Sequence, residues 1–366
     1  MSHNFSQNAK VQMEDSRTEH LVVDPARLNA AEAVCTLDYA AELLRQGGLV
    51  ALPTETVYGL GANALDAQAV ESIFAAKQRP SWDPIIVHIA DLAMLASLVA
   101  DVPPQARLLM QAFWPGPLTL LLPRSAQVPD VVTAGRPLVG VRMPAHPVAL
   151  ELIRRARVPV AAPSANLFGH ISPTTAAHVL ADLDGRIDAV VDAGPTGYGV
   201  ESTVLDPTTN PMTIYRPGAV TIEQIRDVAG AVELYKESAQ LSAELAEALP
   251  SPGVGLRHYA PRARLIVMDA TLDELPLRLS EEMRSHAGEQ VGVMLPEGLG
   301  PVEDCGGAHF FPWGRWDAPE TMARTLYAAM RELDAEGCRV ILCPQPPSDG
   351  IGAAIRDRLR KAARPR

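Results

Sequence analysis

Residues 49–61 read LVALPTETVYGLG, a short apolar run that passes directly into a dense group of polar side chains. The run Leu49–Thr54 predicts a buried strand entering a loop, and the apolar spacing of Ala31–Leu44 predicts a helix before it, ended by two glycines. Two hydroxyls and a carboxylate then precede Gly59 and Gly61, which would let the backbone approach a ligand. The alternative is a capped turn in which the threonine hydroxyls bond local amides.

The alternation of strands and helices continues to about residue 230. Further strands are predicted at Ile85–Ile89, Leu118–Leu122, Val139–Arg142, Val158–Ala162, Ala189–Val191, Ser202–Leu205 and Met212–Tyr215. Helices are predicted at Ala67–Ala76, Leu92–Ala100, Pro104–Phe113, Val148–Ala156, Thr174–Leu183 and Ile222–Val228. Mixed elements with proline-rich junctions indicate an α/β fold, built on a twisted, irregular sheet with flanking helices.

A second domain is predicted after SPGVGLRHYAPRA, a stretch at 251–263 rich in proline, glycine and basic residues, which follows a segment of helical composition at 233–249. Beyond it, strands at 265–270, 291–295 and 338–344 alternate with helices at 321–336 and 352–363. This is the pattern of a small Rossmann-like α/β domain. We therefore divide the chain into a flexible N-terminal tail (1–24), a large domain (25–235), a linker or lid (236–262) and a C-terminal domain (263–366).

Charge and composition argue against several classes of function. Acidic residues outnumber basic ones, 43 to 32, and the acidic excess also holds within residues 24–230. Such a surface repels polyanions, so we expect no stable binding of nucleic acid. No apolar run reaches the roughly 18 residues of a membrane span, and the first twenty residues lack the pattern of a secretory signal, so we expect a cytoplasmic protein with no membrane association.

Cations, hydroxyls and amides gather at the predicted strand ends. Lys77 and Arg79 follow a helix and suit a polyphosphate, although the helix dipole alone also favours cations there. Arg142 lies within an apolar strand, where a buried guanidinium needs a partner, either a bound carboxylate or phosphate or an internal acid. Ser164 and Asn166 suit a ribose or phosphate, but such residues are also common in turns.

Known fingerprints of other enzyme classes do not stand out. Gly59-Leu60-Gly61 lacks the third glycine of a dinucleotide-binding loop, and Gly194–Gly199 is not followed by the lysine of a phosphate-binding loop. No Ser-His-Asp order, Cys-His pair or zinc spacing is evident. The remaining polar groups suit phosphoryl or nucleotidyl transfer, which depends on positioning and charge rather than on a protein nucleophile.

Six motifs follow one another over about 150 residues of the large domain. They are PTETVYGLG (53–61), KQR continued by P-x-x-D-P-x-x-V-H (77–88), WPGPLTL (114–120), VRMP (141–144), PSAN (163–166) and ESTV (201–204). In this order they resemble the YrdC/Sua5 family of threonylcarbamoyl-AMP synthases. The HYAP stretch at 258–261 and the extra domain resemble the long, Sua5-type members, which implies a YrdC-like catalytic domain followed by a Sua5-type C-terminal domain.

The resemblance implies a nucleotidyltransferase that joins L-threonine, bicarbonate and ATP into L-threonylcarbamoyl-adenylate and releases pyrophosphate. Mg²⁺ would accompany ATP, with no metal-binding residue assigned in the protein. The product would serve t6A modification at position 37 of tRNA, and a TsaD-type transferase would take it next. An alternative of another class is a double-stranded RNA-binding module, as related folds have been regarded, although the acidic excess disfavours it.

Individual roles follow from the same resemblance, motif by motif. The residues implied to hold threonine are Thr56, His88, Arg142, Ala162 and Ser202. The residues implied to contact ATP are Lys77, Arg79, Asp83, Leu138, Ser164, Asn166, Ser172, Arg216 and Tyr259. Lys77 and Arg79 would be the catalytic residues near the phosphates, and Tyr259 would be part of a lid. At Asp83 the family usually has Asn, so this carboxylate would bind Mg²⁺, turn away or be protonated.

Overall fold

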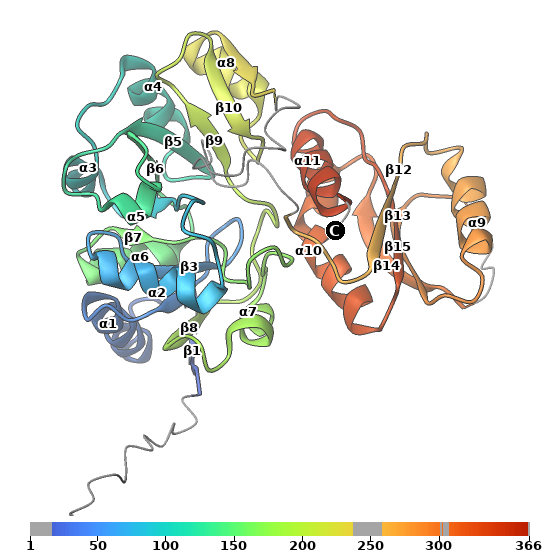
Figure 1. Ribbon diagram of the computed structural model, residues 1–366, viewed down its shortest axis with the longest axis horizontal. Helices are drawn as coiled ribbons and strands as arrows, with labels where there is room; N and C mark the ends of the chain where they lie inside the picture. Colours follow the sequence, from blue (N-terminus) through green and yellow to red (C-terminus); the bar gives the residue numbers. More distant parts are fainter. Residues whose placement is uncertain (1–16, 237–257, 301, 303–306, 365–366) are drawn as a thin grey trace, which may run out of the picture.

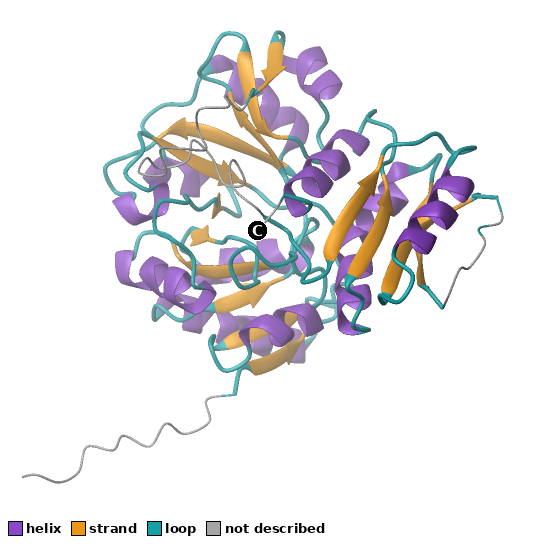
Figure 2. Ribbon diagram, turned by 45° about the vertical axis from the view of Figure 1, so that its right-hand side comes forward, coloured by secondary structure: helices purple, strands orange, loops and turns teal. Residues whose placement is uncertain are grey.

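The computed structural model of the chain describes residues 17–236, 258–300, 302 and 307–364. It contains a large domain built on an eleven-stranded mixed sheet and a small domain built on a four-stranded parallel sheet (Figure 1). Figure 2 shows the two sheets as separate bodies, each flanked by its own helices. Within the described ranges, no helix combines the length and the apolar composition needed to span a membrane.

The large domain holds most of the described elements. Its strands are β1 (Glu19–Val22), β2 (Val50–Leu52), β3 (Gly59–Asn63), β4 (Val87–His88), β5 (Leu118–Pro123), β6 (Leu138–Arg142), β7 (Val160–Ala161), β8 (Ala189–Asp192), β9 (Thr203–Asp206), β10 (Met212–Arg216) and β11 (Val232–Leu234). Its helices are α1 (Ala31–Arg45), α2 (Ala67–Lys77), α3 (Leu92–Leu98), α4 (Pro104–Phe113), α5 (Asp130–Thr133), α6 (Pro147–Ala156), α7 (Ala176–Leu183) and α8 (Ile222–Ala229). The strand order is β1-β8-β2-β3-β7-β4-β6-β5-β9-β10-β11, with parallel and antiparallel neighbours mixed.

The helices cover the sheet in two groups. Figure 1 shows α1, α2, α6 and α7 around the half that contains β1, β8 and β2, and α3, α4 and α8 around the other half. The apolar faces of these helices and the buried side chains of the strands together form the two main cores of the domain. Burial of this apolar surface is the main stabilising contribution to such a domain.

Very short strands in the middle of the sheet bring the motifs together. β4 runs parallel to β6 with His88 opposite Arg142, and β4 also pairs with β7 in the antiparallel sense. β9 joins the sheet through β5, and β10 follows antiparallel to β9. The strand ends that carry the VRMP, PSAN and ESTV motifs therefore meet in one region, although they lie far apart in the sequence.

The small domain has helices on both faces of its sheet. Its strands are β12 (Arg264–Met268), β13 (Val291–Glu297), β14 (His309–Arg315) and β15 (Val340–Pro344), in the order β12-β15-β13-β14, and all pairs are parallel. Its helices are α9 (Leu275–Ser285), α10 (Pro319–Ala335) and α11 (Gly352–Ala362). In Figure 1, α10 and α11 lie on the face of the sheet toward the large domain and α9 on the opposite face. This arrangement confirms the expected second, parallel α/β domain.

Three sequence expectations are corrected by the fold. The tail predicted at 1–24 is too long, because Glu19–Val22 form β1 and pair in parallel with β8. The helical segment predicted at 233–249 begins instead with β11, and residues 237–257 lie outside the described residues. Gly59 and Gly61 were both expected to let the backbone approach a ligand, and both belong to strand β3. A Cβ at Gly61 would come within 2.8 Å of Val160, so Gly61 serves strand packing, whereas Gly59 lines the cavity described below.

Candidate functional site

Ten of the fourteen residues singled out in the sequence line one cavity of the large domain. These are Thr56, Arg79, Asp83, His88, Arg142, Ala162, Ser164, Ser202, Arg216 and Tyr259. Five of them stand at strand ends: His88, Arg142 and Arg216 end β4, β6 and β10, Ala162 follows β7, and Ser202 precedes β9. Ligand sites of α/β sheets commonly lie at such strand ends, so the cavity is the candidate active site.

Arg142 is held on three sides by groups of the protein itself. Its Nε donates to the Gly116 carbonyl at 3.2 Å, and its Nη1 donates to Thr56 Oγ1 at 2.9 Å. Its Nη2 lies 2.6 Å from Glu55 Oε1, in a buried ion pair. The sequence left open whether Arg142 pairs with a bound ligand or with an acid of the protein, and the structure shows the second, Glu55. A substrate carboxylate would share the guanidinium with Glu55 or displace Glu55 from it.

The PTET turn is a capped turn that also presents a hydroxyl to the cavity, so both interpretations of this stretch hold. Thr54 Oγ1 accepts from the amides of Thr56 and Val57 at 3.2 and 3.3 Å, which is the capped turn of the alternative interpretation. Its hydroxyl also lies 2.8 Å from the Thr56 hydroxyl, which in turn faces Arg142. The local turn thus fixes the hydroxyl of Thr56 beside the guanidinium.

His88 is buried in the cavity wall as a neutral imidazole. Burial, reinforced by the charge of Arg142, lowers its pKa to about 3. Within the described part of the chain, no group hydrogen-bonds to His88 Nδ1. An uncharged ring with a free nitrogen can exchange a hydrogen bond with a ligand without adding charge to the cavity.

Ser202 and Arg216 form a second polar wall. Arg216 donates from Nε to the Ser202 carbonyl and from Nη2 to Ser202 Oγ, both at 3.0 Å. Ser202 Oγ also lies 2.8 Å from Thr119 Oγ1, a residue of the WPGPLTL motif. These bonds connect a predicted threonine contact, Ser202, directly to a predicted ATP contact, Arg216.

Lys77 lies behind the cavity rather than in its lining. Its fully buried Nζ donates to the main-chain carbonyls of Ser164 and Asn166, and burial holds its pKa well below the usual range. Asn166 also turns away, because its Nδ2 donates to the Leu167 and His170 carbonyls. In this structure both residues shape the PSAN loop, while Ser164 itself reaches the cavity.

Asp83 is paired with Arg79, the second cation of the KQR motif. The two side chains form a buried ion pair at 2.9 Å, and Arg79 Nη2 also donates to the Pro84 carbonyl at 2.8 Å. Burial raises the pKa of Asp83, although Arg79 and Lys77 oppose this effect. Of the three alternatives given for Asp83, the structure excludes the one in which the side chain turns away, because Asp83 lines the cavity and pairs with Arg79 there.

Of the remaining predicted contacts, Leu138 and Ser172 do not line the cavity, whereas Tyr259 does. Leu138 packs against the apolar cluster of Ile86, Leu121 and Val204 and does not line the cavity. Ser172 is buried, and its hydroxyl donates to Glu201 Oε1 at 2.6 Å. Tyr259 is buried and lines the cavity, as a linker residue near the site would.

Sequence reasoning missed three acidic or aromatic residues at this site. Glu55 and Glu201 stood in quoted motifs without a role, and in the structure each pairs with a buried arginine. The sequence signal that could have found them is an acid directly beside a hydroxyl residue within a motif. His258 precedes Tyr259, lines the cavity and lies 4.0 Å from Asp83 Oδ2. Burial and the charge of Arg79 lower the pKa of His258 to about 3.

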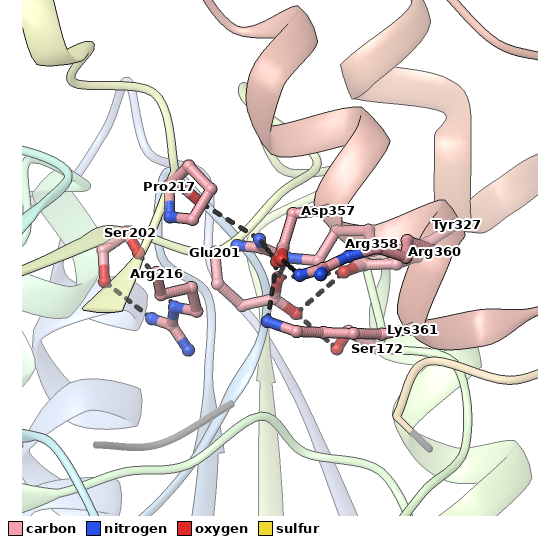
Figure 3. Close-up of polar contacts among 10 residues, drawn as sticks. All are labelled: Ser172, Glu201, Ser202, Arg216, Pro217, Tyr327, Asp357, Arg358, Arg360 and Lys361. Atoms are coloured by element: carbon pink, nitrogen blue, oxygen red, sulfur yellow. Dashed lines mark hydrogen bonds and ion pairs between the residues drawn. The ribbon is translucent and has the colours of Figure 1, made fainter. Parts of the chain in front are cut away.

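Glu201 connects the cavity to the small domain. Figure 3 shows its carboxylate between Ser172 of the large domain and Tyr327 and Arg358, which belong to α10 and α11. Arg358 Nε lies 2.8 Å from Glu201 Oε2, and the Tyr327 hydroxyl lies 2.9 Å from the same oxygen. The small domain therefore supports the wall of the candidate site from behind, through Glu201, and none of its described residues lines the cavity itself.

The combined geometry suits two anionic ligands in one enclosure. Three guanidinium groups, those of Arg79, Arg142 and Arg216, face the same cavity from different strands and loops. Guanidinium groups bind carboxylates and phosphates by paired hydrogen bonds, and hydroxyls beside them add further donors. The arrangement can hold a carboxylate near Arg142 and phosphates near Arg79 and Arg216.

Comparisons with known proteins agree with this site. A family described as telomere recombination (Sua5/YciO/YrdC) matches residues 42–218, and one described as threonylcarbamoyl-AMP synthase, C-terminal domain, matches residues 220–364. Threonylcarbamoyl-AMP synthase of Pyrococcus abyssi is 44% identical over 326 residues, which is 88% of this chain and 93% of that protein. The Bacillus subtilis protein of the same name is 45% identical over 325 residues, with 88% and 92% covered.

Solved structures are similar over nearly the whole chain. Pyrococcus abyssi Sua5 in complex with L-threonine superposes with a TM-score of 0.83 at 40% identity, covering 94% of this chain and 97% of that one. A double-alanine variant of the same protein gives a TM-score of 0.85, with 94% and 96% covered. On the matches in both domains and the two-domain fold, this chain belongs to the Sua5/YrdC family, as a member of the long, two-domain Sua5 type.

Proposed function

We propose that this chain is a threonylcarbamoyl-AMP synthase, a nucleotidyltransferase that condenses L-threonine, bicarbonate and ATP. The observation that carries the proposal is the convergence of three buried arginines and several hydroxyls on one cavity, together with the shared family. Relatives of this name and a relative crystallised with L-threonine support the choice of substrate.

In this proposal, the threonine carboxylate binds at Arg142 and the Thr56 hydroxyl. The guanidinium is already oriented by Gly116 and Thr56, so little reorganisation is needed when the ligand arrives. Neutral His88 and Ser202 offer hydrogen bonds to the remaining polar atoms of the amino acid. ATP would lie toward Arg79, Ser164 and Arg216, with Tyr259 closing over it.

The chemistry requires assembly of the substrates more than a reactive side chain. The threonine amine, after losing a proton, attacks the carbon of bicarbonate, and water leaves to give a carbamate. A carbamate oxygen then attacks the α-phosphorus in line, while the bond from that phosphorus to the bridging oxygen breaks and pyrophosphate departs with the electron pair. Fixed cations stabilise the charge that develops on the phosphates.

Mg²⁺ would enter this site together with ATP. The two acidic side chains in the cavity lining are already paired, Asp83 with Arg79 and Glu201 with Arg358. In the described ranges, no three His, Cys, Asp or Glu side chains are grouped as ligands for a metal. Mg²⁺ is commonly held by nucleotide phosphates and water with few protein ligands, and its role here would be to neutralise phosphate charge.

The product is an activated adenylate, so an acceptor-specific transferase must follow. We propose a TsaD-type transferase acting on tRNA position 37 as that enzyme, and the cytoplasm as the compartment, because ATP and tRNA meet there. The acidic excess of the chain gives no support to stable binding of RNA by this protein itself.

Product formation tests the proposed function directly. The protein is incubated with MgATP, labelled bicarbonate and each amino acid in turn, and AMP-linked product and pyrophosphate are measured. We expect labelled adenylate only with L-threonine or its closest analogues, with one pyrophosphate per product. Absence of labelled adenylate with every amino acid, or RNA retention on a filter without pyrophosphate release, would contradict the proposal.

A further inference from the structure

The small domain reaches the active-site wall through one buried arginine. Arg358 of α11 has no exposed surface, and its Nε lies 2.8 Å from Glu201 Oε2. Its Nη1 donates to the Pro217 carbonyl at 3.0 Å and also lies 2.8 Å from Asp357 Oδ2. A side chain of the small domain thus bonds two separate segments of the large domain.

The two segments that Arg358 contacts also carry Ser202 and Arg216, the two residues of the second polar wall. Glu201 immediately precedes Ser202, and Pro217 immediately follows Arg216. Arg216 in turn bonds both the carbonyl and the hydroxyl of Ser202. Figure 3 shows Arg358 bridging Glu201 and Pro217, with the bonded pair of Ser202 and Arg216 beside them.

The backbones of the two segments, around Glu201 and Pro217, are in close contact. A Cβ added at Gly218 would lie 2.3 Å from the Thr203 amide and 2.6 Å from the Glu201 carbonyl. Such a contact is incompatible with a side chain, so the backbones approach as closely as they can. A displacement of Glu201 or Pro217 would therefore move Ser202 and Arg216 with it.

Tyr327 of α10 completes the same contact. Its hydroxyl donates to the Glu201 carboxylate, and its ring stacks on the ring of Tyr259 with a centroid separation of 5.8 Å. The Arg358 guanidinium also lies over the ring of Tyr259, and its Cζ is 5.3 Å from the ring centroid. The predicted lid tyrosine is thus held by the same two residues that hold Glu201.

The charge of Glu201 makes Arg358 necessary. Burial alone would raise the pKa of Glu201, but the charges of Arg358 and Arg216 outweigh it and the pKa is lowered. The carboxylate is therefore anionic in the wall of a cavity that we assign to a polyphosphate. Without Arg358 its charge would draw Arg216 away from the nucleotide and repel the phosphates.

We infer that Arg358 and Tyr327 are positioning residues through which the small domain orders the nucleotide half of the active site, by fixing Glu201, Pro217 and Tyr259. The inference rests on the proposed function, because it assigns the Arg216 side of the cavity to ATP. The carboxylate end of the threonine site is built on Arg142, Thr56 and Glu55, and among the described residues none of these three hydrogen-bonds to Arg358 or Tyr327. Threonine binding should therefore depend on the two residues only through Ser202, and much less than ATP binding does.

The test compares equilibrium binding of the two substrates to full-length variants. Arg358→Met removes the clamp, and Tyr327→Phe is the conservative variant that keeps the ring stacking and loses one hydrogen bond. Arg324→Met is the matched control. Arg324 of α10 also donates across the domain boundary, to the Gly197 carbonyl at 3.0 Å, and within the described ranges its side chain hydrogen-bonds to no residue of the cavity lining. Binding of a non-hydrolysable ATP analogue and of L-threonine is measured by calorimetry, alongside the KM values.

We expect Arg358→Met to weaken binding of the ATP analogue at least tenfold and Tyr327→Phe to weaken it about threefold. Because Ser202 is the one threonine contact beside the clamp, threonine binding should weaken at most about threefold in Arg358→Met and less than twofold in Tyr327→Phe. Arg324→Met should leave both ligands unaffected. Adding Glu201→Gln to Arg358→Met should restore part of the nucleotide affinity, because it removes the unpaired charge.

Equal losses for ATP and threonine in Arg358→Met, or the same loss in Arg324→Met, would overturn the inference and leave Arg358 as a general domain contact. Unchanged ATP binding in both Arg358→Met and Tyr327→Phe would overturn it as well. A wild-type protein that makes no adenylate would instead refute the proposed function, so the two failures are distinguishable.

Discussion

Glu55 Oε1 lies 2.6 Å from Arg142 Nη2, so the guanidinium proposed to hold the substrate carboxylate already has a carboxylate partner. Both side chains are buried, and such a pair is compensated in charge before any ligand arrives. Glu55 therefore acts either as a competitor of the substrate or as a group that holds Arg142 in place. Because Gly116 and Thr56 also orient Arg142, we expect the competitor role to dominate.

Glu55→Gln tests this relationship. The isosteric change removes the negative charge beside Arg142 and leaves the guanidinium held by two other bonds, so its attraction for an incoming carboxylate should increase. We expect the KM for L-threonine to fall roughly threefold to tenfold, with a lower melting temperature because a buried ion pair is lost. A rise in that KM would show that Glu55 holds Arg142 for the substrate.

Arg142→Ala should have the opposite and larger effect. Without the guanidinium the substrate carboxylate would enter a buried site without a cation and beside Glu55, so we expect the KM for threonine to rise by about 100-fold, which is about 2.8 kcal/mol. The KM for ATP should change little. Arg124→Ala, at a partly exposed arginine paired with Asp130, is the control and should behave as the wild type. An unchanged threonine KM in Arg142→Ala would remove the carboxylate assignment.

Substitutions of Arg79 and of Asp83 should have different effects on activity, because only Arg79 carries the positive charge assigned to phosphate binding. Arg79→Ala removes a phosphate-facing cation and leaves the buried Asp83 without its partner, so we expect pyrophosphate release to fall at least 100-fold. Asp83→Asn keeps the shape and frees Arg79 for the nucleotide, and should retain activity within about threefold. Near-normal turnover in Arg79→Ala would contradict the phosphate assignment. Severe loss in Asp83→Asn would indicate that the carboxylate itself has a role.

Acid should destabilise the fold through buried histidines. His88 and His258 have pKa values of about 3 in the folded protein, below the unfolded value near 6.5, so the unfolded chain binds more protons between these two values. Stability is then retained above about pH 6.5 and lost as the pH falls, by up to about 1.4 kcal/mol per pH unit for each histidine. Urea unfolding between pH 5 and pH 6.5 measures this slope, above the range in which carboxylates contribute most.

The variants His88→Asn and His258→Asn identify the source of that slope. Each should reduce it by the contribution of one proton, and the two reductions should be similar. A slope that is the same in both variants as in the wild type would show that other groups are responsible for the acid sensitivity.

Local sequence patterns predicted the fold where the elements are regular and buried. The helices α4 and α2 and the strands β5 and β6 were expected within a residue or so of their bounds, because their apolar spacing is clear. Strand β14 was missed because it contains Pro312 and Gly314, which are unfavourable in most strands but tolerated at the sheet edge that it occupies. Strand β1 was missed because it is polar and pairs with residues about 170 positions away.

In the candidate site too, the sequence predicted which residues are involved but not which side chains contact one another. The order of the motifs identified most of the lining residues. It could not show that Lys77 donates to the carbonyls of the PSAN loop or that Glu55 forms an ion pair with Arg142. Those facts depend on which side chains meet across the sheet. The contribution of Arg358 was least accessible, since it depends on how a separate domain docks against Glu201, which lies 157 positions earlier in the chain.

The central claim is that one cavity holds threonine at Arg142 and ATP at Arg79 and Arg216 at the same time. A crystal structure of the protein with L-threonine, Mg²⁺ and a non-hydrolysable ATP analogue tests it most directly. We predict the threonine carboxylate within hydrogen-bond distance of the Arg142 guanidinium and the nucleotide phosphates beside Arg79 and Arg216. Either ligand bound outside this cavity, or threonine bound with its carboxylate turned away from Arg142, would contradict the account.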